Sequence, residues 1–260
     1  MNKTDALQDL VDSPVSRRAF AIRTMGAGLG LGSAVIMGAG EEVFAQGITD
    51  VDILNFALNL EYLEAEFYNV ATTGRRITDD GVVVSGTGRA GATTGGARVA
   101  LDDRTGTVAM QITLDEVQHV KFLRAALGSA AIAKPAINLE ALNVGFRNQT
   151  EFLTLARAFE DVGVSAYGGA ASSISSRAIL TAATRIALTE AQHAGVLRLL
   201  VSDNRVVVSP LDELDVLPLM SPGGRQFFVD GDGLSIIRTP AQVLKIAGGF
   251  FPNGVNGNIR

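Results

Sequence analysis

The chain has 260 residues, of which 47% are hydrophobic and 19% charged, and its formal net charge is −5. This balance predicts a globular chain with a well-buried interior rather than a disordered one, and the mildly acidic charge argues against a nucleic-acid partner. Cysteine is absent, which excludes disulfides, zinc–thiolate sites and iron–sulfur clusters, and only two histidines are present.

Residues 1–45 predict a twin-arginine-type signal peptide. The stretch SRRAF, residues 16–20, precedes a glycine-rich apolar run from Thr24 to Gly40. Val43 and Ala45 suit the positions before a signal-peptidase cut, so we expect cleavage after Ala45 and an exported, periplasmic or extracellular protein. The alternative is an uncleaved membrane anchor. The run is short and rich in glycine for that role, so no stable membrane span is expected after cleavage.

Four long stretches of helical periodicity follow the signal. Their expected ranges are about 50–71, 101–127, 146–171 and 176–202. Each stretch carries a broad apolar stripe, and four helices of similar length bury such stripes most simply against one another. The sequence therefore predicts an all-α fold, a four-helix bundle over residues 46–202.

Two irregular segments accompany these helices. Residues 72–98 are rich in glycine, threonine and arginine, which predicts a long loop between the first two helices with a short hairpin at VVVS, residues 82–85. Residues 203–260 hold five of the seven prolines, the strand-like pieces RVVVS and RQFFVDGDG, and a short helix predicted to begin at Thr239-Pro240. We expect this tail to be a C-terminal extension packed on the bundle, because it lacks the apolar content for a core of its own.

Both histidines carry the same sequence signature. His119 lies in DEVQH and His193 in TEAQH, so each follows a glutamate, Glu116 or Glu190, by three residues. This spacing puts the two side chains on one helix face, one turn apart. A single Glu-x-x-His is a weak signal. Two of them, in the second and fourth helices, are the pattern of a carboxylate-bridged two-metal site in a bundle.

The first and third helices supply a matching pair of glutamates. Tyr68 follows Glu61 by seven residues, and Tyr167 follows Glu160 by the same spacing. The chain is therefore duplicated in outline: glutamate, tyrosine and then Glu-x-x-His, twice. The greater separation of these motifs in the first half matches the length of the glycine-rich loop.

The repeat distinguishes among the neighbouring carboxylates. Glu61 is preferred as a ligand because it aligns with the glutamate of the third helix. Glu64 lies about 60° away around the helix and is a reserve ligand, whereas Glu66, about 140° away, is expected to face solvent. Asp115 and Asp161 adjoin ligands in the sequence and are expected at the surface.

The predicted metal ligands are thus two Glu-x-x-His pairs and two single glutamates: Glu61, Glu116, His119, Glu160, Glu190 and His193. Four carboxylates balance the charge of two divalent cations, and without metal they would repel one another in a core. The mixed oxygen and nitrogen set suits iron or manganese, while zinc usually takes fewer ligands. We expect two iron ions, with manganese as the alternative.

Simpler roles exist for the same side chains. The glutamates could pair in buried salt bridges with four arginines: Arg124, Arg157, Arg185 and Arg198. The joint order of six residues along the bundle makes this the weaker explanation. Tyr68 and Tyr167 are expected either to be packed aromatics with satisfied hydroxyls or to be hydrogen-bond donors or redox relays beside the ligands.

At these residues the sequence resembles the ferritin-like superfamily, and within it the branch of exported ferritin-like proteins that includes desiccation-related proteins. The resemblance covers most of residues 48–260 and is carried by five segments: DVDILNFALNLEYLEAEFY, DEVQHVKFL, ARAFEDVGVSAYGGA, ALTEAQHAGVLRLL and TPAQVLKIAGGFFPNGVNG. It implies a four-helix bundle with a dinuclear, usually iron, centre, and all six predicted ligands match the family's ligand pattern.

The expected function is that of a dinuclear metal oxidoreductase with dioxygen or hydrogen peroxide as its small substrate. It would oxidise ferrous iron or remove peroxide in protection against oxidative or drying stress. The alternatives are a manganese catalase and a non-catalytic stress or envelope protein whose fold the metal only stiffens. A storage cage would have to accommodate the long loop and the tail, so a homodimer is the expected oligomer.

Overall fold

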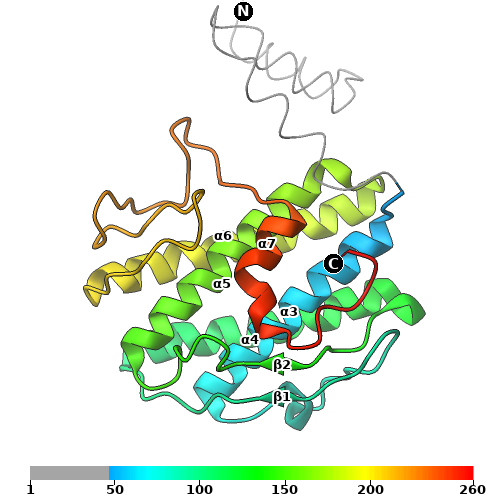
Figure 1. Ribbon diagram of the computed structural model, residues 1–260, viewed down its shortest axis with the longest axis horizontal. Coiled ribbons are helices and arrows are strands. Elements are labelled where there is room, and N and C mark those ends of the chain that lie inside the picture. Colours follow the sequence, from blue (N-terminus) through cyan, green and yellow to red (C-terminus); the bar gives the residue numbers. More distant parts are fainter. Residues whose placement is uncertain (1–46, 260) are drawn as a thin grey trace, which may run out of the picture. The chain divides into compact units, whose positions relative to one another are not determined.

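The computed structural model describes residues 47–259, and the predicted signal peptide, residues 1–45, lies outside the described residues. This part of the chain contains four long helices, and Figure 1 shows how they are arranged. They are α3 (Asp50–Thr73), α4 (Asp103–Leu127), α5 (Gln149–Ala170) and α6 (Arg177–Asp203). Helix α3 packs along α4, and α5 packs along α6. The predicted all-α bundle is confirmed, with helix boundaries within three residues of those expected.

Helix α3 is covered on all sides. Its start is fixed by a capping box in which the Thr49 hydroxyl accepts from the Asp52 backbone and the Asp52 carboxylate accepts from the Thr49 backbone. Its end is fixed by Gly74, whose φ of 76° places it in the left-handed region. Every residue from Asp52 to Thr72 is buried. A helix without an exposed face has no wet side for its carboxylates, so its three glutamates all lie inside the protein.

The loop between α3 and α4 forms part of that cover. It contains no hairpin at residues 82–85, so that prediction was wrong. Instead β1 (Thr93–Thr94) pairs in parallel with β2 (Ile137–Asn138), a strand of the α4–α5 connection, as the lower part of Figure 1 shows. The loop therefore finds its hydrogen-bond partners in the next connection rather than in its own continuation, which local sequence patterns do not reveal.

Glu66 lies beneath this strand pair and is 1% exposed. Its carboxylate accepts hydrogen bonds from Thr93 Oγ1 at 2.8 Å and the Ile77 amide at 3.4 Å, and Lys134 Nζ lies 3.5 Å away. The expectation that Glu66 faces solvent was wrong. Its angle from Glu61 was correct, but the loop and its partner cover that side of α3.

The segment after α6 contacts the bundle through buried arginines. Arg198 on α6, 1% exposed, donates hydrogen bonds to the backbone oxygens of Val216, Arg225 and Gln226 at 2.8–2.9 Å. Arg157 on α5 pairs with Asp215 of the same segment. These contacts tie residues 215–226 to α5 and α6.

The strand-like pieces of this segment form no strand within the described residues, and only an isolated bridge joins Val229 to Ser235. The predicted short helix is present as α7 (Pro240–Ala247), which begins with a capping box at Thr239. Near the chain end, Asn59 on α3 and Asn256 exchange hydrogen bonds of 2.9 and 3.0 Å. None of the helices described between residues 47 and 259 is long and apolar enough to cross a membrane.

Candidate metal centre

Each of the four long helices contributes to one buried cluster. Helix α3 supplies Glu61 and α5 supplies Glu160, while α4 and α6 each supply a Glu-x-x-His pair. The four glutamates are 0% exposed, and His119 and His193 are 8% and 5% exposed. The structure therefore brings all six predicted ligands together in the middle of the bundle.

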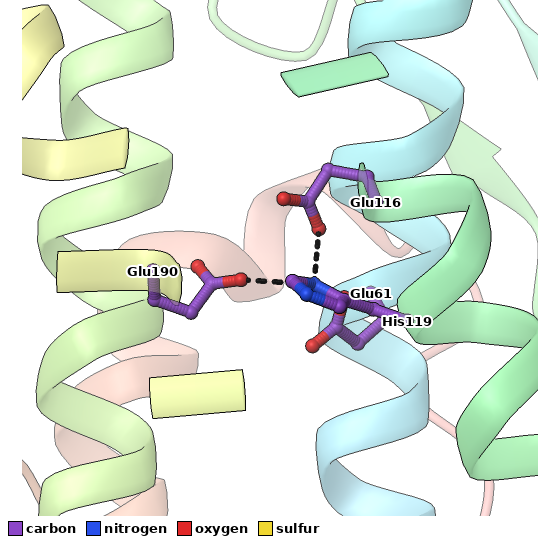
Figure 2. A group of neighbouring side chains, drawn as sticks. All are labelled: Glu61, Glu116, His119 and Glu190. Atoms are coloured by element: carbon purple, nitrogen blue, oxygen red, sulfur yellow. Dashed lines mark hydrogen bonds and ion pairs between the residues drawn. The ribbon is translucent and has the colours of Figure 1, made fainter. Parts of the chain in front are cut away.

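The donor atoms fall into two groups, and within each group they lie within 4.8 Å of one another. The first group is Glu61, Glu116, His119 and Glu190, drawn in Figure 2, and the second is Glu116, Glu160, Glu190 and His193. Glu116 and Glu190 belong to both groups. Two shared carboxylates, with one further glutamate and one histidine on each side, are the donor set of a carboxylate-bridged dinuclear site.

The two histidines present the same ring nitrogen to the carboxylates. His119 Nδ1 lies 3.1 Å from Glu190 Oε1 and 3.3 Å from the nearer oxygens of Glu61 and Glu116. Dashed lines in Figure 2 mark the contacts of His119 with Glu190 and Glu116. His193 Nδ1 lies 3.1 Å from Glu116 Oε1 and 3.3 Å from Glu160 Oε2. The two copies of the sequence motif therefore place their histidines in the same way, each with Nδ1 toward the carboxylates.

Many polar atoms of the cluster lack a hydrogen-bond partner. Eleven buried side-chain nitrogen or oxygen atoms in the described part of the chain have none, and seven of them belong to five of the six predicted ligands. Burying carboxylate oxygens without hydrogen-bond donors costs free energy. Binding a cation offsets this cost, because carboxylate oxygens are good ligands for divalent metal ions. The residues present therefore fit a metal group.

The electrostatics of the cluster also indicate missing positive charge. Burial, and next the charge of Glu61, raises the pKa of Glu116 to about 7. Burial and then Glu116 raise the pKa of Glu190 well above its ordinary value. Burial disfavours the charged form of His193, but Glu116 and Glu160 raise its pKa to about 12. The carboxylates thus repel one another and take up protons more readily, and divalent cations would relieve this repulsion.

Arginine does not supply that charge. Arg157 and Arg198 pair with Asp161, at 2.7 and 2.8 Å, rather than with a glutamate of the cluster. Arg124 donates to the Tyr62 hydroxyl, and Arg185 is exposed. The salt-bridge explanation is therefore wrong for the described residues. The prediction that Asp161 lies at the surface was also wrong, because it is fully buried between the two arginines.

Comparison with known proteins agrees with this geometry. The ferritin-like domain family matches residues 49–203, which include all four long helices. The chain belongs to this family. It is also similar to "Ferritin-like catalase Nec2" of Nesocodon mauritianus, with 23% identity over 267 residues, covering 81% of this chain and 84% of that protein. Membership of the exported, desiccation-related branch stays a prediction.

The two tyrosines of this ferritin-like centre sit on opposite sides of it. Tyr167 Oη donates a 2.5 Å hydrogen bond to Glu61 Oε1. Tyr68 Oη donates to the Ala156 backbone oxygen at 3.4 Å, and its pKa is raised by burial and then by the charge of Glu160. Each tyrosine therefore lies near the glutamate of the other helix, Tyr167 beside Glu61 and Tyr68 beside Glu160.

Glu64 is a fifth buried carboxylate, 4% exposed, that belongs to neither donor group of the ferritin-like centre. A Cβ at Gly163 would lie 2.7 Å from Glu190 Oε2 and 3.2 Å from Glu64 Oε1. The absence of a side chain at Gly163 thus leaves room for both carboxylates. Burial, and then the charge of Glu190, raises the pKa of Glu64 well above its ordinary value.

Asp115, which was expected at the surface, is a further functional candidate. Its side chain is 33% exposed, but its Oδ2 lies 3.2 Å from His193 Nε2, on the ring edge opposite the carboxylate cluster. A carboxylate in this position fixes the orientation and tautomer of a metal-binding imidazole. The repeat gave no signal for it, because the residue aligned with Asp115 in the second half is Thr189.

Proposed function

We propose that this ferritin-like chain holds two metal ions, iron or manganese, and disproportionates hydrogen peroxide. The observation that carries the proposal is the pair of four-donor groups that share Glu116 and Glu190. One shared pair of carboxylates holds two cations close enough to act together. The named catalase among its relatives favours peroxide over ferrous iron as the substrate.

The reaction balances without any other reactant. One peroxide loses two electrons and two protons and leaves as dioxygen, and a second gains both and becomes two waters. When bound, the metal pair supplies the chemistry that proteins lack, because each ion changes its charge by one. The chain therefore needs no site for an organic reductant.

The protein's own residues bind, orient and hold protons. Four carboxylates offset the charge of two divalent cations, so the loaded core is close to neutral. The Tyr167 hydroxyl holds Glu61, and Asp115 holds His193. Burial, and then the charge of Glu190, raises the pKa of the Glu64 carboxyl, so this group favours its proton beside a shared carboxylate.

Export and a role in oxidative or drying stress are part of the same proposal. They are supported by the paired arginines of residues 16–20 and the following apolar run. A homodimer is the proposed assembly. Fractionation of the native host, with detection of the chain cleaved after Ala45, tests the export step.

The decisive experiment measures metal and oxygen together. The purified chain is loaded with iron or manganese, its metal content is determined by elemental analysis, and dioxygen release from peroxide is followed with an electrode. We expect two ions per chain and one dioxygen for every two peroxides consumed. A protein with two ions that oxidises ferrous iron but releases no dioxygen would favour ferroxidase activity. Metal that only raises the melting temperature would favour the stiffening role.

A further inference from the structure

We propose that small uncharged oxidants reach the centre through a portal between α4 and α6 that ends at His119, so the two halves of the duplicated centre differ in access. The inference rests on the proposed function for the identity of the oxidant, peroxide or dioxygen. The portal itself rests on the structure of the chain.

A surface pocket of about 220 Å³ lies at this place. Both helices contribute to its wall, and His119 is one of the lining residues. The others are Gln118, Phe122, Ala182, Arg185, Ile186 and Thr189. His119 is the one member of the six-residue cluster that lines it. The Nδ1 atom of the same imidazole faces the carboxylates, so this one side chain joins the pocket to the cluster.

The second histidine has a carboxylate at the corresponding place. His193 Nε2 has the carboxylate of Asp115 at 3.2 Å. The residue that aligns with Asp115 on the His119 side is Thr189, and its hydroxyl donates to the Arg185 backbone oxygen at 3.2 Å within α6. The Thr189 side chain is shorter than that of Asp115 and is bonded to its own helix, so it leaves space beside His119. We identify the pocket with this space.

A larger pocket of about 480 Å³ lies near the C-terminal end of α3 and is lined by residues such as Thr72, Arg98 and Met110. None of the six cluster residues lines it. We therefore assign the route to the centre to the smaller pocket, because only this one of the two is lined by a residue of the cluster.

The walls of the portal determine what can pass. Phe122, Ala182 and Ile186 are apolar, and the volume is below the ~300–1,000 Å³ of pockets for drug-sized ligands. Hydrogen peroxide and dioxygen are small and uncharged at neutral pH, so they suit this passage. An organic hydroperoxide with a bulky group does not.

The test narrows the portal from within. Ala182 is half-buried in the wall, so Ala182→Phe places a ring in the pocket. Ala178→Phe is the matched control, because Ala178 is exposed on the same helix and does not line the pocket. Phe122→Ala is the opposite change and widens the passage, which keeps the test valid if the narrowed variant fails to fold.

The first readout needs no catalysis. With only two histidines, ¹³C-histidine labelling gives two imidazole signals, assigned with a His193→Gln variant. Dissolved dioxygen is paramagnetic and speeds the relaxation of protons that it approaches. In metal-free and zinc-loaded protein we expect at least a threefold larger effect on His119 than on His193. Ala182→Phe should remove the difference, and Ala178→Phe should keep it. Equal effects on both histidines would overturn the portal.

The second readout is peroxide turnover by the metal-loaded protein. We expect Ala182→Phe to lower kcat/KM for hydrogen peroxide at least tenfold with unchanged metal content. Phe122→Ala should raise the rate with tert-butyl hydroperoxide. If dioxygen relaxation follows the portal but no variant turns over peroxide, the proposed function fails and the portal stands. If turnover is normal in Ala182→Phe, the portal fails and the function stands.

Discussion

Tyr167 on α5 donates a 2.5 Å hydrogen bond to Glu61 Oε1 on α3, so this tyrosine supports the glutamate of the opposite helix. Its partner in the repeat, Tyr68, lies beside Glu160 and donates a hydrogen bond to the Ala156 backbone oxygen at 3.4 Å. The same duplicated motif thus places one tyrosine beside Glu61 and one beside Glu160, with the 2.5 Å hydrogen bond at Glu61. Together with Asp115, this contact makes the two halves of the centre chemically distinct.

Tyr167→Phe should weaken metal binding at the Glu61 side by about tenfold, the lower end of the range for partners that orient ligands. The reason is that Glu61 Oε1 loses its donor while remaining fully buried. Tyr68→Phe is the control and should change affinity less. Competition with a chromophoric chelator measures both constants, and equal losses in the two variants would contradict the assignment.

Asp115→Asn should weaken binding in the group that contains His193, by about 10–100-fold. The carboxylate that fixes the imidazole becomes an amide, while the group that contains His119 keeps its donors. A two-step metal titration should show one weakened and one unchanged step. Asp103→Asn, an exposed aspartate in the first turn of α4, is the control and should leave both steps unchanged.

Glu61→Gln should reduce the metal content below the proposed two ions per chain, whereas Glu64→Gln should not. Glu61 belongs to a donor group and Glu64 to neither. Burial favours the neutral form of Glu64, so its amide replacement changes little in charge or volume. Elemental analysis of both variants decides the matter. Loss of metal from Glu64→Gln alone would mean that the repeat assigned the wrong glutamate.

The sequence predicted the centre better than it predicted the surface around it. The Glu-x-x-His spacing and the repeat depend on helix geometry alone, which is why all six side chains meet as expected. Glu66 and Asp161 were placed in solvent because their burial comes from the loop and the C-terminal segment. Such cover depends on contacts between distant residues, and one sequence does not show them.

The contact of Asp115 with His193 is a second kind of omission. It joins α4 to α6 across residues far apart in the chain, and it breaks the repeat that found the other residues. The hairpin expected at residues 82–85 failed for a similar reason, because that region pairs with the α4–α5 connection. Local patterns predict helices and their faces, whereas the choice of a non-local partner is decided in the folded state.

The metal-free protein should lose stability as the pH rises from about 5 to 8. The pKa of Glu116 is raised from 4.5 to about 7, so the folded state binds its proton more tightly than the unfolded state does. That stability is present below pH 4.5 and is lost as the pH passes 7, a change of about 3 kcal/mol for this group. Glu190 acts in the same direction. The lowered pKa of Glu61 acts below pH 4.5, outside this range.

Metal loading should reverse this dependence, because bound cations need deprotonated carboxylates. Thermal unfolding of the metal-free and loaded chains between pH 5 and 8 measures both slopes. In Glu116→Gln, the metal-free protein should show a smaller pH dependence than the unmodified chain. An unchanged slope in that variant would show that other groups titrate.

Arg198→Met should release the segment after α6 from the bundle. Arg198, itself 1% exposed, pairs with Asp161 at 2.8 Å and donates to four backbone oxygens of residues 216–226. Its loss leaves Asp161 with one cation instead of two and orphans these carbonyls, at a cost of about 3–5 kcal/mol. The melting temperature should fall, and proteases should cut first between residues 205 and 238.

The control is Arg177→Met, which removes an exposed arginine from the first turn of the same helix. It should leave both the melting temperature and the cleavage pattern unchanged. Metal content separates a local from a global effect. Because Asp161 adjoins Glu160, a chain that is cut after α6 yet keeps two ions would show that the segment covers the bundle without holding the centre in place. Loss of metal together with the segment would show that Arg198 and Asp161 also fix the position of α5 at the proposed metal ligands.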